Sequence, residues 1–221
     1  MVKKKADIIS DPEFVPASLT EETFGQGLHF LSDRDPDLAQ ILTKFGPPPM
    51  WAREPGFPAL IHIILEQQVS LASARAAYDR LREAASPLTP VRFLELDDAT
   101  LKAIGFSRQK TAYGRSLAKA LVDGHLDLVR LAMMPDTKVR AELIKIKGIG
   151  PWTADIYLLT ALRRPDIMPS ADLALLTAVQ KVKRLASRPT PDELNTLSQN
   201  WKPWRAVAAR LLWHYYLLQD N

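Results

Sequence analysis

The chain has 221 residues, of which 47% are hydrophobic, and a net charge of +4, so it can form one large domain or two small ones around a real core. It has no cysteine, which excludes disulfides, thiol catalysis and a cysteine-ligated iron–sulfur cluster, and its four histidines show no pair at metal-ligand spacing. No apolar run reaches the length of about 18 residues that a membrane span needs, and the N-terminal lysines precede no apolar segment, so we expect a cytoplasmic protein.

The charge is distributed unevenly along the chain. Residues 1–50 hold 5 Lys and Arg against 8 Asp and Glu, whereas residues 101–152 hold 10 against 4 and residues 181–221 hold 7 against 3. A basic surplus in two segments indicates a face that binds a polyanion. An ordinary solvated helical surface is the alternative.

No segment alternates between apolar and polar residues, and the 17 prolines and 9 glycines lie mainly at the ends of helical patterns. The sequence therefore predicts an all-α fold with roughly ten or more helices. Residues 1–17 have few periodic apolar positions and are predicted to be a loose arm.

The predicted helices follow in chain order, each placed by its caps and its apolar spacing. The first half holds a short helix opened by a capping box at Ser18–Glu21 toward Leu31, a helix from Asp35-Pro36 to Gly46, helices over 60–67 and 71–85 with Ser70 as the second cap, a short helix opened by Thr89-Pro90, one from Asp97 to Gly105, and one from Ser107 toward Gly124. The second half holds a turn or two over 127–133, a helix pair around residues 147–150, a helix over 173–185, a second capping box at Thr190–Glu193, and an amphipathic helix over 204–218.

The turn at residues 147–150 is the most informative segment. Gly148 and Gly150 allow the backbone to turn without a Cβ clash, and they leave the N–H groups that open the second helix uncovered. Such a helix start binds anions, and Lys145 and Lys147 add positive charge, so we predict that these four residues contact phosphate groups. From the spacing alone, an ordinary helix–turn–helix connection with a glycine cap is equally consistent.

Three motifs in order resemble the helix-hairpin-helix DNA glycosylases. The Gly-Ile-Gly turn is followed by a proline-containing loop that ends at Asp172, as in the hairpin–Gly/Pro–Asp signature of that superfamily. Gly-Ile-Gly-Pro-Trp-Thr-Ala, Met-Pro-Ser-Ala-Asp-Leu and the Trp-Lys-Pro-Trp-Arg at 201–205 are most similar to the bacterial 3-methyladenine DNA glycosylase II (AlkA) type. The similarity extends from about residue 55 to the C-terminus.

The resemblance implies two helical subdomains that flank a cleft with the active site. One would comprise residues 55–171 and contain the helix-hairpin-helix at about 137–162, and the other would combine residues 18–54 with residues 172–221. It also implies binding to double-stranded DNA that contains alkylated bases. Nothing in the sequence argues against a monomer, and the lack of a long apolar run indicates no association with membranes. If the source is bacterial, the protein would be nucleoid-associated.

By its place in the motif, Asp172 is the expected catalytic residue, although an aspartate before a helix is by itself an ordinary N-cap. Breaking an N-glycosidic bond develops positive charge on the deoxyribose. A carboxylate stabilises that charge and orients or deprotonates the attacking water. Relatives often have two adjacent acids here, and this chain has Ala171 in place of the first, so the whole task falls to Asp172.

Bifunctional relatives carry a lysine that forms a Schiff base at the position of Trp152. An indole cannot attack the sugar, so the resemblance implies a monofunctional enzyme that uses water. Trp152 and Trp213 are expected to line the base pocket, with Tyr157 and His214 at its border; core packing is the alternative role of such rings. Aromatic faces attract a cationic alkylated purine more than a neutral one.

Duplex DNA buries the target bond, so the nucleotide must be flipped out. Gln68 falls where relatives place a wedge side chain, and an exposed or capping glutamine is the alternative. Relatives also bind a monovalent cation through main-chain carbonyls, which by motif position are those of Ile144, Ile146 and Ile149. This Na⁺ or K⁺ would bridge the protein to a phosphate, and no other cofactor is expected.

Together these features predict a monofunctional DNA glycosylase that releases alkylated purines of the 3-methyladenine and 7-methylguanine class in base excision repair. A bifunctional glycosylase/lyase for oxidised bases and a non-catalytic hairpin module that binds DNA are the alternatives, and a plain helical protein with a fortuitous hairpin is a third.

Overall fold

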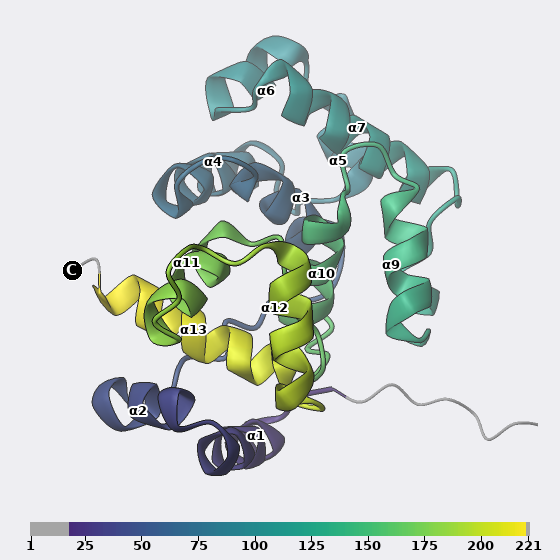
Figure 1. The fold of residues 1–221 in the computed structure, drawn as a ribbon. Helices are drawn as coiled ribbons and strands as arrows, with labels where there is room; N and C mark the ends of the chain where they lie inside the picture. The colour runs from purple at the N-terminus through teal and green to yellow at the C-terminus, as the bar shows by residue number, and fades with distance from the viewer. Residues whose placement is uncertain (1–17, 220–221) are drawn as a thin grey trace, which may run out of the picture.

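The computed structural model describes residues 18–219, and within this range every regular element is a helix (Figure 1). The predicted all-α fold is therefore confirmed for this part of the chain. The predicted arm, residues 1–17, lies outside the described residues. No helix among residues 18–219 has the length and apolar character to cross a membrane.

The helices follow one another with short connections. In chain order they are α1 (Glu21–Arg34), α2 (Pro36–Phe45), α3 (Phe57–Glu66), α4 (Leu71–Ala84), α5 (Pro90–Glu95), α6 (Asp98–Ile104), α7 (Arg108–Val122), α8 (Leu128–Ala132), α9 (Asp136–Ile144), α10 (Pro151–Thr160), α11 (Leu173–Val182), α12 (Pro191–Leu197), the 3₁₀ turn η1 (Ser198–Trp201) and α13 (Arg205–Gln219).

Side-chain caps start most of these helices where the sequence predicted them. The predicted caps that accept a backbone N–H of the first turn are Asp35, Ser70, Thr89, Asp97, Ser107 and Thr190. The start of α1 is a correction. Its cap is Thr20, whose hydroxyl accepts the N–H of Thr23, while the Thr23 hydroxyl accepts the N–H of Thr20. Ser18 instead donates to the carbonyl of Leu162 at 3.2 Å.

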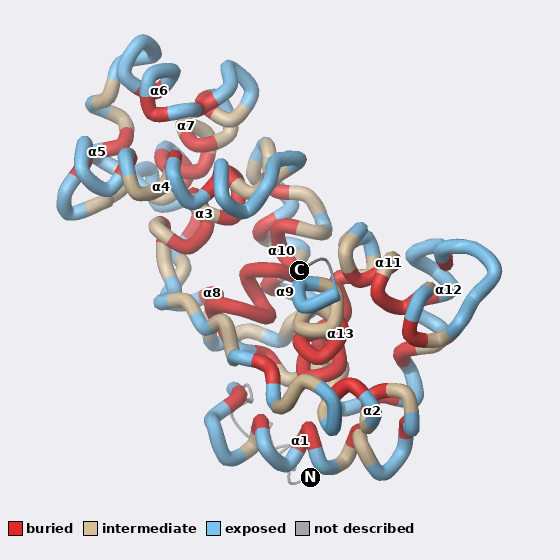
Figure 2. The backbone as a smooth tube through the Cα atoms, turned by 90° about the vertical axis from the view of Figure 1, so that its left-hand side faces the viewer, coloured by how far each residue is buried: buried red, intermediate tan, exposed pale blue. Residues whose placement is uncertain are grey.

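The prediction of an amphipathic C-terminal helix is wrong for the first half of α13. Every residue from 206 to 212 is buried, because α1, α2 and α11 all pack on this helix. Figure 2 shows the buried stretches of α13 and α10 at the centre of the molecule. Arg210 lies within this buried stretch and donates to the carbonyls of Met50, Ala206 and Leu159 at 2.7–3.0 Å. Because other helices cover this part of α13 on several sides, it has no solvent-facing side, and its sequence shows no amphipathic pattern.

The helices pack in two sets. In one, α1, α2 and α11 surround α13; in the other, α3 contacts α4, α7 and α10, and α9 packs on α10. Figure 1 shows the first set below and the second above and to the right. Backbone hydrogen bonds from Leu19 to Arg163 (2.7 Å) and from Arg53 to Thr160 (2.9 Å) join the sets, and one hydrophobic core runs through both. The subdomain boundaries given by the resemblance stay a prediction.

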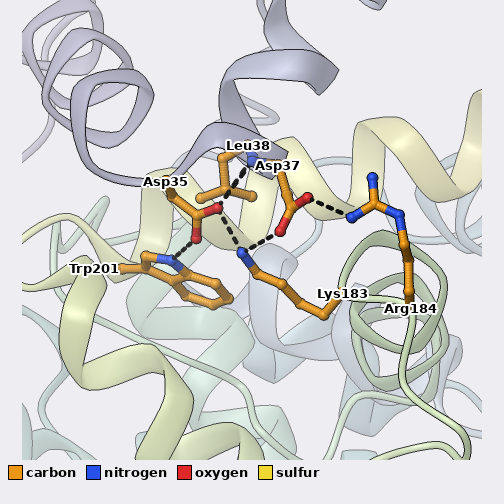
Figure 3. A network of polar contacts seen from close by, with 6 residues as sticks. All are labelled: Asp35, Asp37, Leu38, Lys183, Arg184 and Trp201. Carbon is orange, nitrogen blue, oxygen red and sulfur yellow. Dashed lines mark hydrogen bonds and ion pairs between the residues drawn. The ribbon is translucent and has the colours of Figure 1, made fainter.

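A polar network holds α2 on the C-terminal helices (Figure 3). Asp35 accepts a hydrogen bond from the indole N–H of Trp201 at 2.7 Å and lies 2.5 Å from the Nζ of Lys183, which follows α11. Lys183 also reaches Asp37 at 2.9 Å, and Asp37 pairs with Arg184 at 3.1 Å. The buried part of this network is fully paired, as the cost of burying charged groups requires.

Candidate functional site

Asp172 is the N-cap of α11, and its carboxylate receives hydrogen bonds from three elements. Its Oδ1 accepts the N–H of Leu175 at 3.0 Å and the indole N–H of Trp213 at 3.1 Å. Its Oδ2 accepts the indole N–H of Trp152, in the first turn of α10, at 2.8 Å. Trp152 and Trp213 are 20 and 41 positions from Asp172 along the chain, and the structure brings these three predicted site residues together.

The Asp172 side chain is partly exposed, and its neighbours Ala171 and Leu173 are exposed. An ionised carboxylate has about four acceptor positions, and the three N–H donors occupy three of them. The bonds fix the orientation of the group and leave about one position for a water molecule or a substrate. The local geometry suits a carboxylate that holds a nucleophilic water or faces a developing positive charge.

Trp51 is a site residue that the sequence analysis missed. Its ring meets the ring of Trp213 edge-on with centroids 6.4 Å apart, and that of His214 at 6.5 Å. Its backbone φ is 47°, a left-handed value that bulky side chains rarely adopt. The buried Arg210 donates to the preceding carbonyl, that of Met50, at 2.7 Å and helps to hold this conformation. The only signal in the sequence was an aromatic residue after a proline run, far from Trp213 along the chain.

His214 lies at the edge of this aromatic group. Its Nε2 is 3.1 Å from the carbonyl oxygen of Phe45, and its ring contacts those of Phe45 and Trp51. It is partly exposed, on the turn of α13 that also carries Trp213. The structure therefore places His214 next to the pair of Trp51 and Trp213, and not in direct contact with Asp172.

The prediction that Tyr157 borders a base pocket is wrong. The residue is completely buried, its hydroxyl accepts the N–H of Gly56 at 3.2 Å, and burial raises its pKa to about 12. The physical reason lies in α10, which is buried on every side from Thr153 to Thr160. Only Pro151 and Trp152, in the first turn, reach the surface, so Tyr157 lies in the part of α10 that the core encloses.

The two glycines of the hairpin between α9 and α10 differ in backbone conformation and in the space around them. Gly148 has a φ of 95°, and a Cβ there would lie 2.1 Å from the ring of Tyr113. Gly150 has an ordinary φ of −92° and is the N-cap of α10; nothing lies within 4 Å of where its Cβ would be, and no side chain caps the helix. The start of α10 therefore faces open space, as an anion site requires.

The two predicted lysines lie on this hairpin and are exposed. Lys145 pairs with Glu142 at 2.7 Å, so part of its charge is neutralised within α9 and the turn that follows it. Lys147 is exposed on the turn itself. The positive charge available to an external phosphate therefore sits mainly at Lys147 and at the start of α10.

Gln67 and Gln68 follow α3, and Gln67 connects its end to the hairpin. Gln68 is exposed with a φ of 56°, directly after α3. Gln67, another residue that the sequence analysis missed, caps the end of α3 and directs its side chain to the hairpin, where Nε2 donates to the carbonyl of Gly148 and to the hydroxyl of Thr153, both at 2.9 Å. The sequence signal was the adjacent glutamine pair at the end of an apolar helix.

Within residues 18–219 no group of three or more His, Asp or Glu side chains is arranged to hold a metal ion. The carbonyl of Ile146 accepts the N–H of Ile149 at 3.0 Å and keeps a second lone pair, so its donor type fits a monovalent cation. Cation binding by the carbonyls of Ile144, Ile146 and Ile149 stays a prediction. Two surface hollows of about 590 and 260 Å³ lie beside Asp35 and Asp37 and are not lined by Asp172, so the predicted cleft at Asp172 also stays a prediction.

The chain is similar to known proteins both in sequence and in fold. A family model described as "HhH-GPD superfamily base excision DNA repair protein" matches residues 61–204. The chain is 31% identical over 162 residues to a putative DNA-3-methyladenine glycosylase of Bacillus subtilis, covering 70% of this chain and 56% of that protein. It is 27% identical over 216 residues to DNA-3-methyladenine glycosylase 1 of Schizosaccharomyces pombe, covering 96% of this chain and 94% of that protein.

A solved structure of the Schizosaccharomyces pombe 3-methyladenine DNA glycosylase in complex with abasic DNA has a TM-score of 0.78 at 26% identity. The match covers 85% of this chain and 95% of that one. The chain thus spans about half the length of the bacterial relative (56%) and nearly the whole length of the yeast one (94%).

Proposed function

Because the chain belongs to the HhH-GPD superfamily of base excision DNA repair proteins, we propose that it is a DNA-3-methyladenine glycosylase. It would hydrolyse the N-glycosidic bond of alkylated purines of the 3-methyladenine and 7-methylguanine class in double-stranded DNA and leave an abasic site. The observation that carries the proposal is the partly exposed carboxylate of Asp172, oriented by Trp152 and Trp213 at the start of α11. The names of the relatives support the lesion class.

Asp172 would act on the sugar. As the bond to the base breaks, the deoxyribose becomes electron-poor, and a fixed carboxylate lowers the energy of that state. The acceptor position left on the carboxylate would hold or deprotonate the attacking water. Because the three N–H donors already hold the group, it needs no rearrangement when charge develops.

The aromatic group of Trp51, Trp152 and Trp213 supports the choice of substrate. Alkylation at N3 or N7 gives the purine a positive charge, which makes it a good leaving group, so a strong general acid is not required. It also makes the base a better partner for an indole face, by about 0.5–2 kcal/mol per contact. Trp51 meets Trp213 edge-on, and Trp213 donates to Asp172, so a base held against these rings would lie near the acid.

The presence of a tryptophan at position 152 supports a monofunctional reaction. The indole N–H of Trp152 donates to Asp172, so this side chain supports the acid and offers no amine to the sugar. Water is then the nucleophile. The protein would act as a monomer, since nothing in the proposed chemistry requires a second copy.

The hairpin would bind the DNA backbone. The uncapped start of α10 and the exposed Lys147 offer N–H groups and positive charge to a phosphate. Gln68, exposed at the end of α3, would fill the gap left by the flipped nucleotide. A Na⁺ or K⁺ ion at the carbonyls of Ile144, Ile146 and Ile149 would bridge the hairpin to that phosphate.

The test is base release from methylated DNA with identification of the released bases. Release of 3-methyladenine and 7-methylguanine, with abasic sites and no strand cleavage, is expected. DNA binding without base release would support a non-catalytic module instead. A covalent protein–DNA adduct after borohydride reduction would show a lyase and refute the monofunctional reaction.

A further inference from the structure

Gln67 makes the only side-chain link, among the hydrogen bonds of residues 18–219, between the end of α3 and the α9–α10 hairpin. Its Nε2 carries two N–H groups, and both are used: one on the carbonyl of Gly148 and one on the hydroxyl of Thr153, each at 2.9 Å. Thr153 is almost completely buried, so this end of the link does not move freely. The side chain of Gln67 is partly buried, whereas that of Gln68 is exposed.

The link joins the two surfaces that would contact DNA. On one side of Gln67, the next residue, Gln68, has a strained backbone with a φ of 56° and points into solvent. On the other side, Gly148 belongs to the hairpin and Thr153 to the first turn of α10. The residue before Thr153 is Trp152, which donates to Asp172. A short path of hydrogen bonds and peptide bonds thus connects the turn at Gln68 to the hairpin and to the acid.

We propose that Gln67 is a positioning residue that fixes the separation between the wedge turn at Gln68 and the hairpin. This inference rests on the proposed function. In the proposed function, the hairpin binds a phosphate while Gln68 enters the base stack of the same duplex. The separation between the hairpin and Gln68 must therefore match the spacing of these two points on the DNA. Without the Gln67 link, the turn at Gln68 is held by its backbone alone, and base displacement from paired DNA becomes inefficient. Chemistry on a base that is already unpaired is much less affected, because little displacement is needed.

The experiment compares two DNA duplexes of one sequence, each with a single 7-methylguanine. In one the lesion is fully paired, and in the other it lies in a short mismatched bubble. Single-turnover release is measured for the wild type, Gln67→Leu and Gln67→Met, which keep the size of the side chain and remove its donors. Loss of two neutral hydrogen bonds is expected to slow release from the paired duplex about tenfold or more, with a change below about threefold for the bubble.

Lys110→Met is the matched control. The Nζ of Lys110 donates to the carbonyl of Leu65 at 2.7 Å and ties the same end of α3 to α7, but it does not contact the hairpin. If general loosening of α3 were the cause, this variant would change the ratio of the two rates as Gln67→Leu does. We expect its ratio to equal that of the wild type.

A second readout combines Gln67→Leu with Gln68→Ala. If Gln67 acts through Gln68, the double variant is about as slow on paired DNA as Gln68→Ala alone. Additive losses, or an equal loss on both duplexes, would overturn the inference and leave the proposed function standing. A wild-type protein that releases no base from either duplex would overturn the proposed function, and this inference with it.

Discussion

The indole N–H of Trp152 donates to Oδ2 of Asp172 at 2.8 Å, so the first turn of α10 and the cap of α11 are joined at the surface. The same turn of α10 follows the hairpin, whose open helix start faces solvent. The group proposed to act on the sugar is thereby fixed relative to the group proposed to hold the phosphate. Both relationships can be tested by substitution.

Asp172→Asn is expected to lower base release by about a hundredfold or more, because an amide cannot stabilise the electron-poor sugar or accept a proton. Asparagine is an equally good N-cap and its oxygen can still accept the N–H of Leu175, so α11 should stay folded. Release rates, affinity for abasic DNA and thermal unfolding are measured together. Normal release by this variant would show that Asp172 is not the catalyst.

Substitution of Trp51 is expected to reduce the release of a cationic base in a graded way. Trp51→Phe keeps a weaker aromatic face, and Trp51→Leu removes it, so the rate of 7-methylguanine release should fall in that order, by about 2- to 30-fold in total. Affinity for abasic DNA, which presents no base, serves as the control and should change little. Equal rates for the wild type and both variants would place Trp51 outside the base site.

Alanine at the two hairpin glycines should separate folding from DNA binding. Gly148→Ala forces a side chain into a left-handed backbone and against the ring of Tyr113, so a loss of more than about 2 kcal/mol in the free energy of unfolding is expected. Gly150→Ala meets open space at an ordinary φ and should cost about 1 kcal/mol or less, the price of an alanine N-cap.

The Gly150→Ala variant should nevertheless bind DNA more weakly, since its new methyl group stands at the N-cap of α10, the helix start that is proposed to bind a phosphate. Urea unfolding and the salt dependence of binding to undamaged duplex DNA measure the two effects. Unchanged DNA affinity in Gly150→Ala would contradict a phosphate contact at this helix start.

Asp37 should give the folded protein a pH-dependent stability. The hydrogen bond from Lys183, with help from the charges of Lys183 and Arg184, lowers the pKa of Asp37 below its ordinary value. The folded state therefore favours the ionised form, and the stabilisation is complete above the unfolded pKa of about 4 and is lost as the pH falls through the folded pKa. The free energies of unfolding of the wild type and Asp37→Asn, measured from pH 6 downward, should differ most at pH 6 and converge below about pH 4. A constant difference across this range would argue against the ion pair.

Much of the fold could be predicted from local patterns because its causes are local. A capping side chain reaches only the next three residues, so Asp35, Ser70 and Ser107 mark helix starts in the sequence itself. The left-handed turn at Gly148 likewise requires a glycine whatever surrounds it. The family motif then pointed to Asp172, which the structure places on the surface with Trp152 and Trp213.

The errors fall where a residue's surroundings come from distant parts of the chain. The resemblance placed Tyr157 at the border of a base pocket, but α3 and α9 pack on α10 and bury this residue. The first half of α13 was expected to have a solvent face, but α1, α2 and α11 leave it none. Helical periodicity shows which residues share a face, and it does not show how many neighbours that helix has.

By itself, the sequence determined where most of the helices start and where the hairpin turns, because short-range hydrogen bonds and backbone conformations decide those features; its family motif pointed to the acid that follows. Only the tertiary structure decided that Trp51 meets Trp213, that Gln67 reaches the hairpin, and that two indoles converge on Asp172. Those contacts join residues tens to more than a hundred positions apart, and their geometry follows from how the helices pack, which no local pattern records.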